Sequence, residues 1–160
     1  MHGFIRAPHG TSTTFDAPGA ATPFPYYGTQ PNSINPEGTI TGYYLDANVV
    51  FHGFIRAPDG KITTFDAPGA GADPGDGEGT FPTAIIANGT VVGFFQDTSW
   101  LTHGFSRSPD GKFTTFDVPG AGTVVGSWQG TYPNDINQWG AITGLWVDAN
   151  NVWHGFLRIP

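Results

Sequence analysis

The stretch HGFIRAPDGKITTFDAPGA, residues 52–70, occurs in this chain in three closely similar copies. An earlier copy, HGFIRAPHGTSTTFDAPGA at residues 2–20, matches it at 16 of 19 positions, and HGFSRSPDGKFTTFDVPGA follows at residues 103–121. The histidine that opens the motif stands at positions 2, 52, 103 and 154, so the period is 50 or 51 residues. A period of this length is typical of architectures in which stacked supersecondary units bury a continuous core.

Each repeat contains four strand-like segments separated by turn residues. In the HGF segment a period of two places His52, Phe54 and Arg56 on one face and Gly53 and Ile55 on the other. β-Branched and aromatic residues dominate, and Pro or Gly interrupts every stretch long enough for a helix, so we expect almost no helix. The four segments around the second copy are residues 28–35, residues 39–46, the HGF segment and residues 62–68.

These segments predict an all-β fold with four-stranded antiparallel blades repeated about every 51 residues, similar to a β-propeller. The alternative is a β-trefoil, because three four-stranded units also suit one closed threefold barrel. In either case the chain reads as a single repeat domain, 1–160. Its units are about 2–51, 52–102 and 103–153, with a fragment at 154–160.

Composition excludes several classes of partner and site. The chain has 13 acidic and six basic residues, a net charge of -7, and no Lys/Arg cluster, so we expect no nucleic acid partner. It has no cysteine, which excludes disulfides and thiolate metal sites. No apolar run approaches the ~20 residues that span a bilayer, so we expect no membrane partner. The N-terminal residues MHGFIRAP do not have the pattern of a signal peptide.

The strand rhythm resembles bacterial extracellular repeats of the HAF type, in which a segment similar to IN-x-x-G-x-V-V-G precedes H-A-F-L-W. The resemblance covers essentially the whole chain. This chain departs from it with Gly53 where the family usually has Ala, and with Arg56 where it often has Trp. The resemblance implies a propeller-like fold and an extracellular or cell-surface location, and it brings no defined activity. Its anchors here are Ile34, Asn35, Gly38, Gly42, His52, Gly53 and Phe54.

The ends of the chain fall at complementary points of the repeat. The chain starts with the third and fourth segments of a unit and finishes with the first three segments of another. Strands from one end could complete the blade at the other end, within one chain or between two. Three blades make an implausibly tight ring, whereas two chains would supply six, within the usual range of about four to eight. We therefore expect a homo-oligomer, with a dimer of six blades as the favoured form.

The recurring His, Arg and Asp are interpreted as structural. His52 and Arg56 share a strand face, and Asp66 ends the neighbouring strand, which suits a charge-assisted pair inside each unit. Presence in every unit favours a scaffold role over catalysis. Asp46, with its counterparts Asp97 and Asp148, closes the second strand, where Asx side chains commonly cap a turn.

The loop GADPGDGEGT, residues 71–80, carries three carboxylates on a Gly-rich segment. Asp73, Asp76 and Glu78 could bind calcium, although their spacing matches no EF-hand, and an exposed acidic loop is the alternative. Together with Glu37 they are also the candidates for paired acid/base chemistry. A secreted glycoside hydrolase or lyase that uses them is a further functional alternative.

Four aromatic residues stand in loops and turns where the repeats differ. Stacking on the apolar face of a sugar, or burial in a protein interface, suits such positions above a rigid β frame. The favoured function is therefore a non-enzymatic, lectin-like module that binds carbohydrate. A purely structural or engineered self-assembling unit is the alternative. The predicted ligand-binding residues are Tyr26, Trp100, Trp128 and Trp139.

Overall fold

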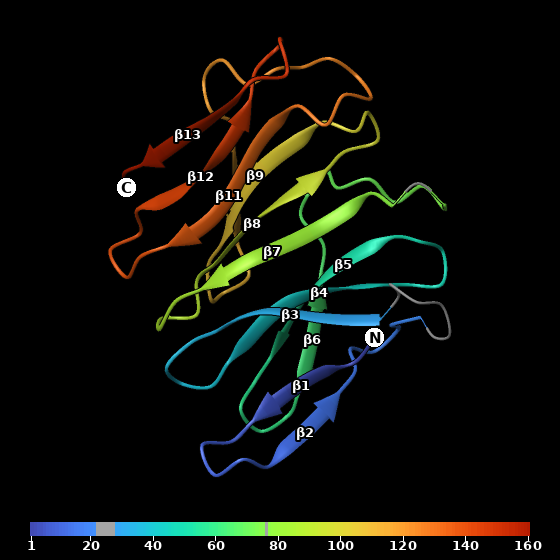
Figure 1. Cartoon of the computed structure of the whole chain (residues 1–160), viewed down its shortest axis with the longest axis vertical. Helices are drawn as coiled ribbons and strands as arrows, with labels where there is room; N and C mark the ends of the chain where they lie inside the picture. The colour runs from blue at the N-terminus through green and yellow to red at the C-terminus, as the bar shows by residue number, and fades with distance from the viewer. Residues whose placement is uncertain (22–27, 76) are drawn as a thin grey trace.

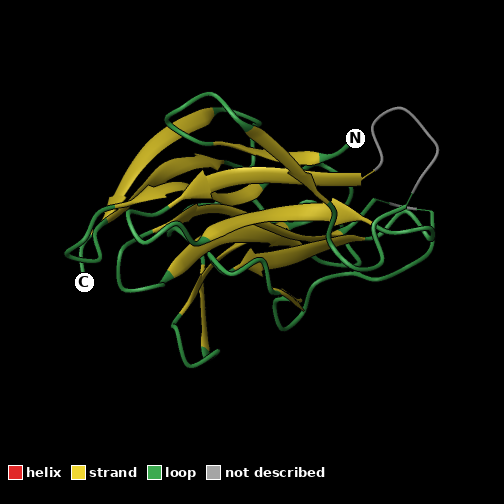
Figure 2. Cartoon of the chain, turned by 90° about the horizontal axis from the view of Figure 1, so that it is seen from below, coloured by secondary structure: helices red, strands yellow, loops and turns green. Residues whose placement is uncertain are grey.

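The computed structural model describes residues 1–21, 28–75 and 77–160, and these ranges contain only strands, turns and loops (Figures 1 and 2). The all-β prediction is confirmed. Among the described residues there is no helix long and apolar enough to cross a membrane. The strands are β1 (Gly3–Arg6), β2 (Ser12–Phe15), β3 (Gly28–Ile34), β4 (Ile40–Leu45), β5 (Phe51–Arg56), β6 (Ile62–Phe65), β7 (Gly79–Ile85), β8 (Val91–Gln96), β9 (Thr102–Arg107), β10 (Phe113–Phe116), β11 (Gly130–Ile136), β12 (Ile142–Val147) and β13 (Trp153–Arg158).

The four predicted segments of each repeat pair as antiparallel neighbours in chain order. Strands β3 to β6 form one four-stranded meander, and β7 to β10 form a second. Strands β11 to β13 form a three-stranded meander, and β1 pairs with β2 in a separate two-stranded sheet. Successive meanders are linked by one parallel pair each, Phe51 with Gly79 and Thr102 with Gly130.

Successive repeats pack face against face through the motif residues. Phe54 is 0% exposed, and its ring meets Phe15 of the preceding repeat edge-on at a centroid distance of 6.0 Å. The guanidinium of Arg56 lies 5.0 Å from the centre of the same ring. Phe105 and Phe65 repeat the ring contact at 6.5 Å one unit later. Burying each phenylalanine contributes about 1.5–3 kcal/mol, so copies of the motif that make the same contacts hold the stack together.

A backbone tether fixes each connection to the next repeat. The amide of Ala67 donates to Thr80 Oγ1 at 2.9 Å, and the amide of Ala17 donates to Thr29 Oγ1 at 2.8 Å. Thr29 and Thr80 are fully buried. Because a buried amide needs a partner, the threonine at the start of each first strand positions the loop that precedes it.

The stack is open at both ends. The first hairpin, β1 and β2, lies at one end of the long axis, and β11 to β13 lie at the other (Figure 1). The main sheet runs in order from β13 to β3, and no pairing joins these two strands. Within the described residues the single chain therefore closes neither a propeller ring nor a trefoil barrel.

Candidate functional site

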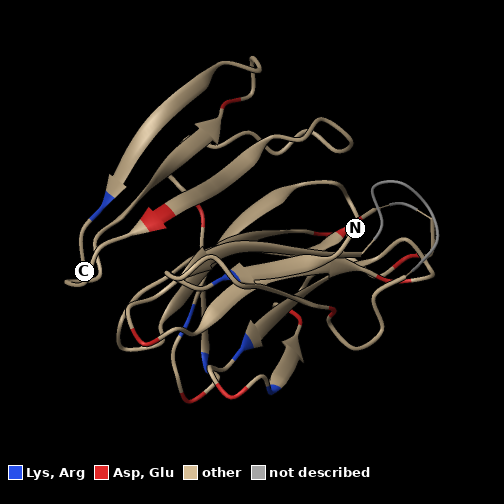
Figure 3. Ribbon diagram, turned by 60° about the horizontal axis from the view of Figure 1, so that its bottom comes forward, with Lys and Arg blue, Asp and Glu red and all other residues tan. Residues whose placement is uncertain are grey.

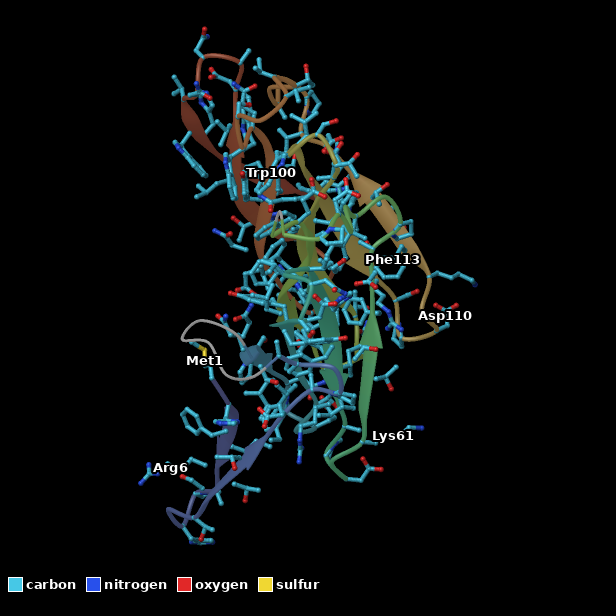
Figure 4. The ribbon with its side chains drawn as sticks, turned by 90° about the vertical axis from the view of Figure 1, so that its right-hand side faces the viewer. Met1, Arg6, Lys61, Trp100, Asp110 and Phe113 are labelled. Carbon is cyan, nitrogen blue, oxygen red and sulfur yellow. The ribbon has the colours of Figure 1, made fainter. Side chains whose placement is uncertain are left out.

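Two of the four predicted aromatic residues come together. Trp100 lies in the β8–β9 turn and Trp128 in the connection between β10 and β11, and their ring centroids are 5.0 Å apart with planes inclined at 55°. Trp128 is 52% exposed, and Trp100 is half-buried. The pair lies within the C-terminal half of the stack, far along the molecule from Arg6 (Figure 4). We call Trp100 and Trp128 the tryptophan pair.

Both residues of the pair have left-handed backbone, which is unusual for a bulky side chain. The φ angle is 62° at Trp100 and 59° at Trp128. The first position is held by Val49 and Asn151 in the other repeats, with φ of 67° and 61°, so the conformation belongs to the turn itself. The second is held by Gly77, which adopts this region without cost. A non-glycine residue in this region costs about 1–2 kcal/mol of backbone strain, a cost that Val49 and Asn151 also bear in the other repeats.

The backbone around the tryptophan pair is held by short hydrogen bonds. Asp97 Oδ1 accepts from the amides of Ser99 at 2.8 Å and Leu101 at 3.0 Å. The amide of Gly126 donates to the carbonyl of Ser99 at 2.9 Å, which ties the connection to the turn. The phenol of Tyr132 donates to the Trp128 carbonyl. These hydrogen bonds hold in place the backbone that carries the two rings.

The other two predicted aromatic residues do not join the pair. Trp139 is 75% exposed in the β11–β12 turn. This turn connects the first and second strands of its meander, so it lies at the opposite end of the strands from the β8–β9 turn, which connects a second and a third strand. Tyr26 lies outside the described residues. Trp139 and the tryptophan pair therefore lie at opposite ends of the strands.

The residues predicted to bind calcium differ in their exposure to solvent. Asp73 is exposed, whereas Glu78 is 1% exposed and its carboxylate lies against Gly71. Gln129 holds the equivalent place beside Gly122, accepts from the amide of Val124 at 3.1 Å and donates to Asn151 at 2.9 Å. This equivalence shows that the position anchors a loop.

No group of three His, Asp or Glu side chains able to hold a metal ion occurs in residues 1–21, 28–75 or 77–160, and Asp76 lies outside these ranges. Calcium binding stays a prediction. Glu37 lies in the β3–β4 turn. The amides of Gly75 and Gly77 donate to the β4–β5 turn and hold the acidic loop there, at the other end of β4. Glu37 is therefore not paired with Asp73 or Glu78.

Each complete repeat contains a histidine between two aspartates, which we call the Asp–His–Asp cluster. His52 Nδ1 lies 2.9 Å from Asp66, and its Nε2 lies 3.6 Å from Asp46. His103 lies 3.0 Å from Asp117 and 3.4 Å from Asp97. The His–Asp pairing expected from the strand faces is confirmed, and Asp46 also caps its turn through the amides of Asn48 and Val50, both at 2.9 Å.

The surroundings of these histidines favour the protonated ring. The hydrogen bond to Asp117 raises the pKa of His103, and the hydrogen bond to Asp66 raises the pKa of His52, while partial burial opposes both shifts. His103 contacts Asp117 through Nδ1 at 3.0 Å and Asp97 through Nε2 at 3.4 Å, so its ring links the ends of three strands. A cavity of about 410 Å³ lies beside His103, between Phe95, Asp117 and Gly69.

The arginines pack on rings. Arg107 lies 4.9 Å from the centre of the Phe65 ring, and Arg158 lies 4.8 Å from that of Phe116. Each ring belongs to the preceding repeat, so the arginine joins two repeats. This contact was absent from the sequence-based interpretation, which placed the arginine in charge pairs inside one unit. Burial lowers the pKa of Arg107, which is consistent with a guanidinium packed against residues of the neighbouring repeat.

Basic residues appear as separate short segments of the ribbon in Figure 3. The exclusion of nucleic acid stays a prediction. In comparisons with protein-family models, with curated proteins and with solved structures, none matched this chain.

Proposed function

We propose that this chain is a non-enzymatic binding module that recognises carbohydrate through the tryptophan pair, on four-stranded units arranged like propeller blades. The observation that carries the proposal is the placement of Trp100 and Trp128 side by side, with Trp128 exposed, at positions that the other repeats fill with Val49 or Asn151 and with Tyr26 or Gly77.

The geometry suits a ligand with an apolar face and a polar rim. An indole ring offers a broad apolar surface with few rotatable bonds, so stacking on a pyranose costs little conformational entropy. Val124 and Val125 of the same connection are also exposed and add apolar surface to it. Ser99 and Ser127 are partly exposed next to the two rings in sequence and supply hydroxyl groups for hydrogen bonding.

The blade-like arrangement is supported by the packing of successive meanders. Each first strand lies across the second and third strands of the preceding unit, as the contact between Phe81 and Tyr43 at 5.4 Å illustrates. Covering both faces of a four-stranded unit with its neighbours is the packing principle of a propeller. A rigid repeat of this kind carries its binding residues in loops that differ between units.

Titration of the chain with a panel of neutral oligosaccharides, followed by tryptophan fluorescence and calorimetry, tests the proposal. Trp128→Ala should weaken binding at least about tenfold, the scale of losing one central aromatic contact. Trp139→Ala is the matched control, because it removes an exposed turn tryptophan at the opposite edge and should leave the affinity unchanged. If no oligosaccharide binds, or if only Trp139→Ala weakens binding, the proposal is wrong.

A further inference from the structure

The contact between neighbouring repeats gives a template for the two ends of the stack. In the first complete meander, the face that meets the following repeat includes Phe51, Ile55 and Phe65, and we call the equivalent positions in any repeat the forward face. Phe51 and Phe81 of the next repeat have ring centroids 4.7 Å apart, and Phe65 reaches Phe105. In the last repeat the forward face consists of Leu145, Trp153 and Leu157, all of which are exposed, with Leu157 at 67%.

Gly155 shows what this exposed face lacks. A Cβ added at Gly53 would lie 2.7 Å from Phe65 and 2.9 Å from Pro82, so two side chains press on that glycine. A Cβ at Gly104 would lie 2.9 Å from Phe116 and 3.0 Å from Pro133. At Gly155 a Cβ would meet nothing within 4 Å. The last repeat therefore has an open place for a fourth-strand phenylalanine and for the proline of a following repeat.

The other end of the stack has the residues that fit this place. Phe15 on β2 is the equivalent of Phe65, and Pro31 on β3 is the equivalent of Pro82. Among the described strands, β2 is paired only with β1, in a two-stranded sheet of four residue pairs, and Phe4 on β1 is 63% exposed. The hairpin is packed on one face, where Ile5 and Phe15 contact the core around Phe54, and its other face is open.

A cavity of about 310 Å³ lies between β1 and β3, lined by Phe4, Ile5, Pro31 and Ile34 among others. Between complete repeats, the second strand of the preceding unit lies beside the first strand of the next, as β4 does beside β7. The cavity therefore marks the place of a missing second strand. In the last repeat that strand is β12, which carries the exposed Leu145.

The Asp–His–Asp clusters at the two ends are complementary halves. His154 has Asp148 at 3.2 Å from Nε2, and the described residues provide no counterpart of Asp66 for its Nδ1. His2 has Asp16 at 2.8 Å from Nδ1, and the described residues provide no counterpart of Asp46. Asp16 of a second copy would give His154 the second carboxylate that His52 and His103 have.

We propose that two copies of the chain associate head to tail by strand exchange, in which β13 of one copy replaces β1 beside β2 of the other. The exchange preserves register, because Gly3 pairs with Phe15 in the same way as Gly53 pairs with Phe65 and Gly104 with Phe116. Gly155 then takes the place of Gly3. The segments differ little, HGFIR in one and HGFLR in the other. One hairpin pairing is exchanged for another, and the net gain is the covered forward face.

Two reciprocal exchanges complete a third four-stranded unit in each copy and close an assembly with six such units in total. The contact is heterologous, since a C-terminal surface meets an N-terminal one, and such contacts form closed rings when the rotation between copies allows it. Six units lie within the usual range of about four to eight for propellers. The inference concerns an interface away from the tryptophan pair, and it does not depend on the proposed function.

The mass of the 160-residue chain in solution tests the exchange. At micromolar concentration, light scattering should give twice the 17.0 kDa of one chain. Leu157→Asp should raise the dissociation constant about a hundredfold or more, because it buries an unpaired charge in the interface. Phe4→Asp is the matched control, since it places the same charge on β1, which the exchange releases, and should leave the mass at twice that of one chain. A monomeric parent chain, or dissociation by Phe4→Asp alone, would overturn the proposal.

A designed cross-link tests the register. The chain has no cysteine of its own, so Thr13→Cys combined with Leu157→Cys introduces one defined pair at positions that face each other only after exchange. Oxidation should give a covalent pair of chains on a non-reducing gel, whereas either cysteine alone should not. A product that runs as a single chain, or a ladder of longer products, would contradict closure by two copies. Trp128→Ala added to the two cysteine substitutions should leave the cross-link intact, and Leu157→Asp in the parent chain should leave the binding of any oligosaccharide unchanged.

Discussion

In each complete repeat a histidine lies between two carboxylates, and its protonation affects the stability of the repeat. His52 and His103 join the ends of three strands, and the pKa of each is raised first of all by its hydrogen bond to the fourth-strand aspartate. An imidazolium in this position contributes to folding only while it keeps its proton. The repeat therefore has a charge clamp whose strength depends on pH.

This clamp predicts a stability that falls as the solution becomes alkaline. Because the folded-state pKa of His103 lies above the unfolded value of about 6.5, its stabilisation is fully present below that pH and is lost as the pH rises through the folded-state value. Urea unfolding measured between about pH 5.5 and 9 should show this decline in the parent chain. His103→Gln should reduce the decline, and so should Asp117→Asn. Parallel curves for parent and variants would show that the cluster does not contribute.

At the scale of the element, the HGF strand needs a glycine because two side chains pack closely against that position. In the two complete meanders this glycine lies under a phenylalanine of the neighbouring strand and a proline of the next repeat. Alternation places the glycine on the forward face and the flanking histidine and phenylalanine on the opposite face. One strand thereby serves both interfaces of its repeat.

The effect of substituting this glycine on the free energy of unfolding should depend on which copy is changed. Gly104→Ala places a methyl group 2.9 Å from Phe116 and 3.0 Å from Pro133, and should lower the free energy of unfolding by about 1–3 kcal/mol. Gly155→Ala meets nothing within 4 Å and should be neutral or slightly stabilising when measured in a Leu157→Asp background, where the chain is monomeric under our proposal. Chemical denaturation of both variants checks the comparison. Equal losses at the two positions would contradict it.

At the scale of the whole molecule, the repeats are not equally protected. The middle meander is covered on both faces, and Val91, Val92 and Phe105 within it are 0% exposed. The end strands β1 and β13 each have one uncovered face. In a stack where each repeat contacts only its neighbours, stability decreases toward the ends.

Hydrogen exchange resolved by peptide should follow this order. The amides of β8 and β9 should exchange slowest, and those of β1 should exchange fastest. At concentrations where two copies associate, β13 should become protected while β1 stays unprotected, because the exchange replaces one by the other. Leu157→Asp should return β13 to fast exchange at every concentration. Protection of β1 and β13 together on association would mean that both hairpins persist, and it would refute the exchange.

Several features of the site followed from sequence pattern, and others required the fold. The strand face that carries His52, and the aspartates near it, were predictable because alternation along a strand is a local rule. The contact of Arg56 with Phe15 was not, since the partner belongs to a repeat about 40 residues earlier and no local rule reaches it. Likewise Glu78 and Asp73 were grouped because they are close in sequence, and the structure was needed to show that Glu78 is buried while Asp73 is exposed.

The sequence by itself determined the repeat, its period, the absence of helix in the described residues and the order of four strands, because these depend on local preferences and on a period of two. The tertiary structure alone decided that Trp100 lies against Trp128 while Trp139 stands apart, and that Gly155 faces open space while Gly53 does not. The physical reason is that such contacts depend on which faces meet once the sheets are stacked. A repeated sequence specifies the same face in every copy, and only the position of a copy in the stack determines what covers it.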